Sequence, residues 1–269
     1  MSDAITLSLR APLEVRLEVE RLTGDHLAGL SEGDIAALPV WMGNRSVPLG
    51  EFFDVKGERS SSVRIEGDVS RLDGLGAGMS AGELVVAGDA GSYVAAGMTG
   101  GVVEVLGHVG NDAGVAMSGG TLRIQGNAGD RLAAARPGAS RGMTGGEVIV
   151  RGSAGAEVAA RCRRGLVAVA GDVGDHAGRS MIAGTLIVLG ATGPEAGRGN
   201  KRGSIVAVGP ITVPQTYRYA CTYEPTYVRL VMTRLERTYG LEASGLEGRY
   251  RRFCGDAGEP GKGEILQHV

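Results

Sequence analysis

Apolar residues in the middle of the chain recur with a period of nineteen positions. A glycine marks each copy of the repeat, and the residues four and two positions before that glycine are apolar in every copy. Each copy therefore predicts one short strand with two inward side chains, ending at its glycine. The marker glycines are Gly67, Gly88, Gly107, Gly126, Gly152, Gly171, Gly190 and Gly209.

The regular spacing of these glycines predicts the fold class. Five of the seven intervals are identical, and the longest, from Gly126 to Gly152, contains seven inserted residues. A unit of this length is too short for a propeller blade, and no helical periodicity lies between the markers. We therefore expect an all-β chain, a right-handed parallel β-helix in which a single-stranded solenoid of about eight coils spans residues 61–209.

The two ends of such a stack expose strand edges that need covering. Residues 1–60 predict a small α/β capping module, with alternating strands over 5–19 interrupted at Pro12 and a short helix after Ser31. Residues 210–269 predict a C-terminal helix and tail. The helix is expected between Pro225 and Gly240, because apolar residues recur there at every fourth position.

Composition narrows the class of protein. The net charge of −2 gives no overall attraction to nucleic acid or to an anionic membrane, so neither is predicted as a partner. Three widely spaced cysteines indicate reduced thiols, and no segment resembles a signal peptide or a membrane span. We expect a cytoplasmic protein. The residue patterns predict no catalytic, cofactor-binding or metal-binding residue in this chain.

A column of sulfur-containing residues occupies one position of the repeat. Stacked thioethers can hold a soft metal such as Cu(I), but identical positions of stacked coils also bring identical side chains together in a core. The second interpretation is favoured, so the column is predicted to be structural. This methionine column consists of Met79, Met98, Met117, Met143, Cys162 and Met181.

The residues after the marker glycines suggest a second metal. Some β-helices bind calcium through carboxylates in their turns, and Asp68, Asp89 and Asp172 follow markers here. The other copies have different side chains at this position, so the carboxylates do not stack. Polar residues that form turns explain this column better than calcium binding.

One outward position changes character along the repeat. It is charged in early copies and aliphatic in the last four, which creates an apolar strip that a folded protein does not leave exposed. Two alternatives remain open: a partner protein covers this strip, or the helix expected at 225–240 covers it. The apolar strip consists of Ile149, Ala168, Ile187, Leu189, Val206 and Val208.

Arginine is concentrated around the seven-residue insertion. Residues 123–164 contain eight arginines and three acidic residues, a local charge of +5. Guanidinium groups bind carboxylates and phosphates, so the cluster is a candidate site for an acidic partner surface or a polyanionic ligand; a solvated surface is the alternative. The arginine patch predicted to bind consists of Arg131, Arg136, Arg141, Arg161, Arg163 and Arg164.

Several motifs carry a resemblance to known proteins. Gly-Met-Thr-Gly-Gly occurs at 97–101 and at 142–146, and the repeat resembles both the C-terminal domain of the glutamate synthase large subunit and the C subunit of formylmethanofuran dehydrogenase. The flanking segments are similar to the second family. They are Leu-Pro-Val-Trp-Met-Gly-Asn at 38–44, Leu-Gly-Glu-Phe-Phe-Asp-Val at 49–55, Arg-Phe-Cys-Gly-Asp at 252–256 and Gly-Lys-Gly at 261–263.

The resemblance implies a function. The excess of arginine over lysine is typical of bacteria with GC-rich genomes. Within that family, it therefore favours the bacterial formyltransferase/hydrolase complex, which takes part in formaldehyde oxidation, over the tungsten or molybdenum dehydrogenases. The resemblance implies that this chain is a scaffold subunit, whose partners are amidohydrolase-like, molybdopterin-enzyme-like and formyltransferase subunits. A methanofuran-type carrier and tetrahydromethanopterin would be handled by the complex. A glutamate-synthase-like domain and a stand-alone carbohydrate-active β-helix enzyme remain alternatives.

Overall fold

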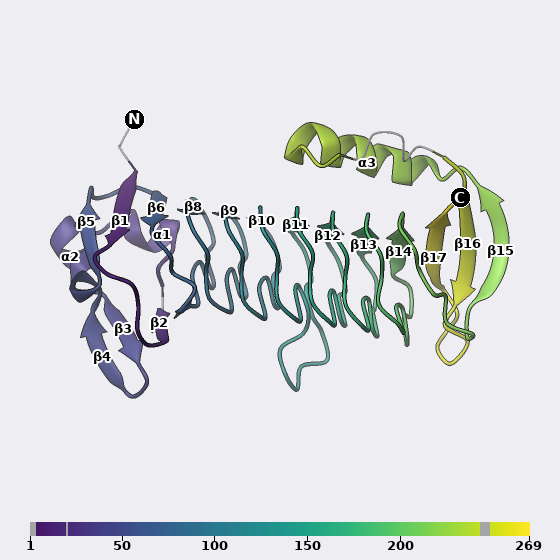
Figure 1. The fold of residues 1–269 in the computed structure, drawn as a ribbon, viewed down its shortest axis with the longest axis horizontal. Coiled ribbons are helices and arrows are strands. Elements are labelled where there is room, and N and C mark those ends of the chain that lie inside the picture. Colours follow the sequence, from purple (N-terminus) through teal and green to yellow (C-terminus); the bar gives the residue numbers. More distant parts are fainter. Residues whose placement is uncertain (1–3, 20, 243–247) are drawn as a thin grey trace.

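A row of short parallel strands runs along the molecule, one for each marker glycine (Figure 1). The computed structural model describes residues 4–19, 21–242 and 248–269. The remaining residues of the predicted caps, 1–3, 20 and 243–247, lie outside this description. The strands of the row are β6 (Ser62–Glu66), β8 (Glu83–Val86), β9 (Val102–Val105), β10 (Thr121–Ile124), β11 (Glu147–Val150), β12 (Leu166–Val169), β13 (Thr185–Val188) and β14 (Ser204–Ala207).

The strands of this row pair in the register of the repeat. Leu84 of β8 lies opposite Val103 of β9, so equivalent positions stack on one another. The register survives the longest interval, because Leu122 of β10 pairs with Val148 of β11. A second line of parallel bridges runs from Val69 to Thr192 on another side of the stack. The chain is mostly β, as the apolar pattern predicts, and its main sheet has 13 strands in the described residues.

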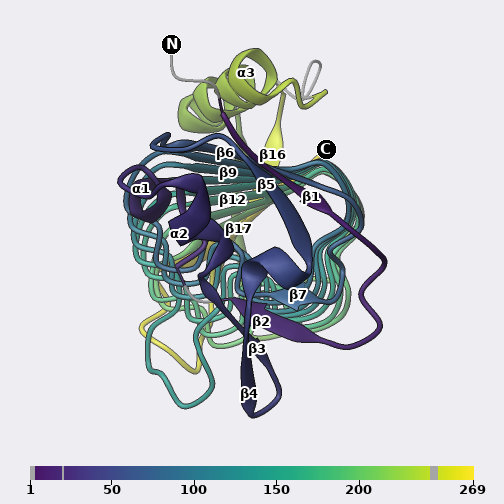
Figure 2. The same cartoon turned by 90° about the vertical axis from the view of Figure 1, so that its left-hand side faces the viewer.

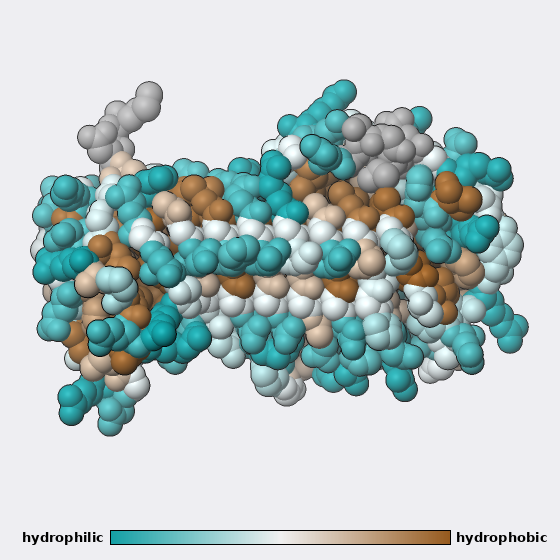
Figure 3. Space-filling view, in the orientation of Figure 1, coloured by the Kyte–Doolittle hydropathy of each residue, from teal (hydrophilic) through white to brown (hydrophobic). Residues whose placement is uncertain are grey.

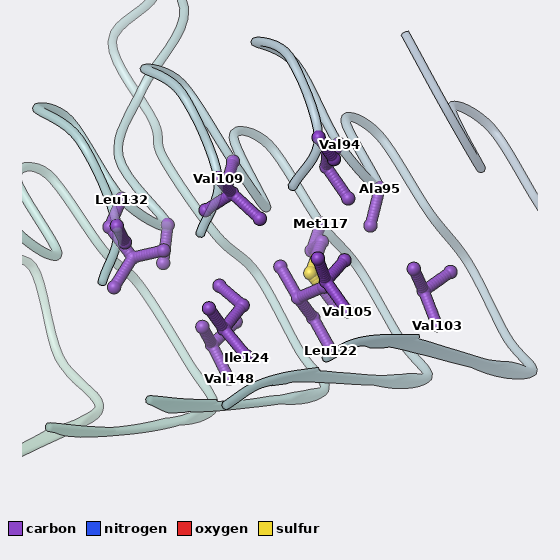
Figure 4. Packing of buried hydrophobic residues seen from close by; sticks show 14 of the residues in the cluster. Val94, Ala95, Val103, Val105, Val109, Met117, Leu122, Ile124, Leu132 and Val148 are labelled. Atoms are coloured by element: carbon purple, nitrogen blue, oxygen red, sulfur yellow. The ribbon is translucent and has the colours of Figure 1, made fainter. Parts of the chain in front are cut away.

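The core lies inside the stack. Side chains from successive strands, such as Val103, Val105 and Leu122, pack against residues from the opposite side of the coils (Figure 4). Glycine is required where the chain turns into a strand. Gly101 has a φ of +80°, and a Cβ there would lie 2.7 Å from the carbonyl oxygen of Gly82. The repeated glycines therefore allow the coils to approach closely.

The N-terminal module covers one end of the stack (Figure 2). Its strand β1 pairs parallel with β6 and antiparallel with β5, so the main sheet continues into the module and ends at β5. Pro12 does separate two strands, but the second is shorter than expected because residues 13–16 lack a strand partner. The other elements are β2 (Leu17–Val19), β3 (Pro39–Met42), β4 (Arg45–Pro48), β7 (Leu72–Asp73), α1 (Gly24–Leu27), α2 (Glu32–Ala36) and η1 (Leu49–Glu51), with β1 at Ile5–Leu9 and β5 at Phe53–Lys56.

The C-terminal segment contains more strands than the sequence predicts. The expected helix is present as α3 (Thr226–Tyr239), with Pro225 as its N-cap and Gly240, in the left-handed conformation, as its C-cap. Three strands were not expected: β15 (Arg218–Tyr223), β16 (Tyr250–Gly255) and β17 (Gly263–His268). They extend the main sheet, because β17 pairs parallel with β14 and antiparallel with β16, which pairs in turn with β15. In the described residues, no helix is long and apolar enough to cross a membrane.

Candidate partner-binding surfaces

Helix α3 lies along the outer face of the last strands of the stack (Figure 1). It begins after the chain has left the stack at β15 and runs back over β14 toward β11. Its apolar side presents Val228, Met232 and Leu235, each 1% exposed, to the sheet. The helix and the outer sheet face thus form a second, smaller core outside the coils.

The apolar strip is buried in this second core. Ile149, Ala168, Ile187 and Val206 are at most 3% exposed and contact the helix cluster, and Leu189 and Val208 are half-buried at its margin. Of the two alternatives, the structure shows the second, because the chain's own helix α3 covers the strip. The strip is therefore corrected from a free partner surface to an internal interface, because burial of its aliphatic side chains under α3 removes them from water.

Polar contacts fix the C-terminal end of α3 on the stack. The guanidinium of Arg151 donates a hydrogen bond to the carbonyl of Tyr239 at 2.8 Å, and Arg123 lies over the Tyr239 ring at 5.2 Å from its centroid. Arg234 pairs with Glu147, whose carboxylate also accepts the Tyr239 hydroxyl. Burial and the nearby Glu147 carboxylate raise the pKa of Tyr239, so the hydroxyl stays protonated and donates.

The sheet face beyond the end of α3 is not covered by the helix. Arg64, Val85 and Glu104 lie on it at the position that the apolar strip occupies further along, and Arg123, next in this column, lies against Tyr239 at the end of the helix. Hydrophobic surface remains over β8 and β9 (Figure 3), and Leu106, directly after β9, is 45% exposed. Under α3 this column holds only aliphatic residues, whereas outside the helix it holds the charged Arg64 and Glu104 together with Val85.

The methionine column lies in the main core. All six of its side chains, Cys162 included, are fully buried. Burial raises the pKa of the Cys162 thiol to about 12, so it is protonated and unreactive at neutral pH. No group of three or more His, Cys, Asp or Glu side chains that could hold a metal ion occurs in the described parts of the chain. The column fills space along the axis of the stack.

Polar residues that directly follow the marker glycines bind the backbone of the next coil. The Asp89 carboxylate accepts the backbone N–H of His108 at 2.7 Å, and Nδ1 of His108 accepts that of Asn127 at 2.8 Å. Asn127, Ser153 and Asp172 accept the backbone N–H one coil further on in the same way. The interpretation that polar residues occupy this column for structural reasons therefore fits these five side chains, since each of them supplies an acceptor.

The arginine patch is divided between two hollows. Arg131, Arg136 and Arg161 line a pocket of about 390 Å³, whereas Arg163 and Arg164 line a separate depression of about 580 Å³. Arg141 lines neither of these two. The residues of the predicted patch are therefore divided between two separate hollows.

The sequence alone missed one arginine in each hollow. Arg179 completes the first pocket, and Arg202 completes the second. Arg164 and Arg202 occupy the same position of the repeat two copies apart, so the repeat register contains the signal that brings them together. Arg179 lies in the copy after Arg161 and faces the same side.

Comparison of this sequence with known proteins identifies its relatives. No family model matches the sequence. The chain is 53% identical over 261 residues to the C subunit of the formyltransferase/hydrolase complex Fhc of Methylorubrum extorquens, which covers 97% of this chain and 98% of that protein. The chain belongs to this C-subunit family. The predicted resemblance is thereby confirmed.

Structural similarity covers the same length. A chain in the crystal structure of the formyltransferase/hydrolase complex FhcABCD from Methylorubrum extorquens, in complex with methylofuran, superposes with a TM-score of 0.92 and 36% identity over 98% of this chain and 99% of that one. The C subunit of the molybdenum-containing formylmethanofuran dehydrogenase 1 of Methanosarcina barkeri is 38% identical, but over 99 residues only. That match spans 35% of this chain and 33% of the relative, so the chain matches about a third of the length of that dehydrogenase subunit.

Proposed function

We propose that this chain is the structural C subunit of a formyltransferase/hydrolase complex, with no catalytic residue of its own, in the oxidation of formaldehyde to formate. The observation that carries the proposal is the match over nearly the whole length, in sequence and in fold, to a subunit of such a complex. Both caps and helix α3 are included in that match, so it extends well beyond the glycine repeat.

The proposed role requires a rigid and extended framework. We take the repeat region to be a right-handed parallel β-helix, supported by the parallel pairing of β6 to β14 in register and by the second line of bridges. Capping strands at both ends cover the edges of the stack. Such a rod offers a long surface of fixed shape on which other subunits can be held in register.

Partners and cofactors follow from the same proposal. The amidohydrolase-like, molybdopterin-enzyme-like and formyltransferase subunits would carry the chemistry, together with a methanofuran-type carrier and tetrahydromethanopterin. The arginine patch would contribute to binding an acidic partner surface. The three cysteines are unpaired, which fits a cytoplasmic location.

A second candidate is the C subunit of a tungsten or molybdenum formylmethanofuran dehydrogenase. The observation in its favour is the match to such subunits, for example 38% identity over 99 residues to the tungsten-containing enzyme of Methanothermobacter thermautotrophicus. That match covers 35% of the chain, against 97% for the formyltransferase/hydrolase relative. The length of the match therefore favours the first proposal.

Purification of the native complex tests these proposals. A tagged copy of the chain should retain the other subunits, and the complex should transfer and hydrolyse formyl groups while the isolated chain should not. Tungsten or molybdenum in an active complex would support the second candidate instead. Flavin or an iron–sulfur cluster in the retained partner would favour a glutamate-synthase-like domain, and activity of the isolated chain would support a stand-alone enzyme.

A further inference from the structure

The inserted residues form a loop that leaves the stack between β10 and β11 (Figure 1). Backbone hydrogen bonds anchor both ends of the loop to the next coil, from Ala135 N–H to Ala160 and from Gly142 N–H to Arg161. The guanidinium of Arg161 donates to the carbonyl of Ala139 at 2.9 Å, within the loop. The loop therefore has a fixed position, and it forms one wall of the pocket of about 390 Å³, which we call the loop pocket.

The charges that line the loop pocket do not balance. Arg131 forms two hydrogen bonds to Asp112, whose carboxylate is buried behind it, and Arg179 pairs with Glu157 at 3.1 Å. Arg136 and Arg161 also line the pocket, and no carboxylate among the described residues pairs with either. Four guanidinium groups therefore face two carboxylates, which leaves a charge of +2 on a preformed concave surface.

The position of the loop pocket along the stack is unique. The marker glycines from Gly88 to Gly209 are evenly spaced except across the insertion. A periodic surface offers similar contacts at each coil, so a partner could bind in registers shifted by about 4.8 Å. A charged pocket walled by the insertion occurs at one level only, so only one register places the partner's charge in it.

We propose that the loop pocket binds carboxylate side chains of an acidic segment of a neighbouring subunit, and so sets the register of that subunit along the stack. Arg136 and Arg161 both line the pocket without a carboxylate partner, and a guanidinium group binds a carboxylate through two parallel hydrogen bonds. The inference rests on the proposed scaffold function. Its own content is the ligand class and the residues that bind it.

Charge reversal at Arg136 tests the loop pocket in the intact complex. Arg136 makes no side-chain hydrogen bond or ion pair with the described residues, so Arg136→Glu leaves the fold intact, which circular dichroism verifies. We expect the affinity for the remaining subunits to fall at least about tenfold near physiological salt, and to depend less on salt concentration. Arg136→Lys keeps the charge and should retain most of the affinity.

The matched control is Arg45→Glu, an equal change of charge on the exposed hairpin of the N-terminal module. It should leave the affinity unchanged. An equal loss in Arg45→Glu and Arg136→Glu would overturn the proposal, because it would reflect net charge alone. Unchanged assembly of Arg136→Glu would overturn it as well.

A cross-link identifies the occupant. With p-benzoylphenylalanine in place of Ser140, an exposed loop residue next to Ala139 of the pocket lining, irradiation of the complex should link the loop to an acidic segment of one subunit. A complex that assembles without such a cross-link contradicts the loop-pocket proposal alone. A wild-type chain that retains no subunits contradicts the proposed function. If inorganic phosphate raises the melting temperature of the wild-type chain but not of Arg136→Glu, while assembly is equal, the pocket binds a small anion and the proposal fails.

Discussion

Arg234 of helix α3 places its guanidinium 2.6 Å from the carboxylate of Glu147, the first residue of strand β11. The Glu147 side chain is mostly buried, 17% exposed, whereas that of Arg234 is 55% exposed. The same carboxylate accepts the hydroxyl of Tyr239. One acidic side chain on the stack therefore positions the last two turns of the helix that covers the apolar strip.

Removing either partner of this ion pair should loosen α3. Arg234→Ala should lower the free energy of unfolding by about 0.5–1 kcal/mol, since the arginine is partly exposed and screened by water. Glu147→Ala should cost about 1–2 kcal/mol, because it also leaves Tyr239 without its acceptor. Urea unfolding of both single variants and of the double variant measures the coupling free energy between the two side chains. A coupling of zero at low salt would show that the pair contributes nothing.

Substitutions on opposite sides of α3 should differ sharply. Met232 is 1% exposed against the stack, whereas Leu230, two residues earlier, is 63% exposed. Met232→Asp buries an unpaired carboxylate in the second core and should destabilise the chain by about 3–5 kcal/mol, with aggregation as the apolar strip opens. Leu230→Asp should change stability by less than about 0.5 kcal/mol. Size-exclusion chromatography and thermal melts compare the two, and equal behaviour would refute cover by α3.

The repeat predicts those parts of the fold in which local pattern and tertiary contact coincide. Because equivalent positions stack, the constant period predicts the pairing of Leu84 with Val103 and the burial of the methionine column. The limits of α3 were predictable from Pro225 and Gly240, since both act on the backbone locally. What covers the apolar strip was not predictable, because the spacing of residues does not say which segment folds back.

The strands β15 to β17 and the loop pocket depend on contacts that no local pattern encodes. Each of these strands is stabilised by its neighbour in the sheet, and none belongs to the repeat. The loop pocket combines a loop from one copy with Arg161 and Arg179 from the next two. The concentration of arginine was visible in the sequence, but its division into two hollows depends on the loop and the neighbouring coils that line each hollow.

His108 should be replaceable by another acceptor. Its Nδ1 accepts the backbone N–H of Asn127, and Asn127 performs the same task one coil later through its side-chain oxygen. His108→Asn should therefore keep the stability within about 0.3 kcal/mol, whereas His108→Ala leaves the N–H to water and should cost about 0.5–1 kcal/mol. Chemical denaturation distinguishes them. Equal losses in both variants would show that the imidazole ring, and not the acceptor, matters.

The thiols of Cys221 and Cys162 should react at very different rates. Cys221 is exposed on the edge strand β15, whereas Cys162 is fully buried and its pKa is raised to about 12 by that burial. Iodoacetamide at pH 8 should label Cys221 in the native chain and leave Cys162 unmodified until the chain is unfolded. Mass spectrometry of tryptic peptides follows the labelling. Rapid native modification of Cys162 would contradict its place in the core.

Acid should weaken the attachment of the C-terminal strands through Asp256. Burial alone would raise the pKa of this carboxyl, but hydrogen bonds from the backbone N–H groups of Gly199 and Gly258 outweigh it and hold the pKa below its ordinary value of 3.8. A pKa that is lower in the folded chain stabilises the fold above pH 3.8, and this contribution is lost as the pH falls through the folded-state value.

Asp256→Asn isolates that contribution. The amide keeps a single acceptor oxygen and no charge, so at pH 7 the variant should be less stable than wild type by about 1–2 kcal/mol. As the pH falls from 3.8 through the lower folded-state pKa, the wild-type carboxylate becomes protonated, and the difference between the two chains should shrink toward zero. The other carboxylates titrate alike in both chains and cancel in the comparison. Urea unfolding of both chains at a series of pH values from 7 down into the acid range measures this difference. A difference that stays constant with pH would show that Asp256 is not held as a carboxylate between the last coil and its cap.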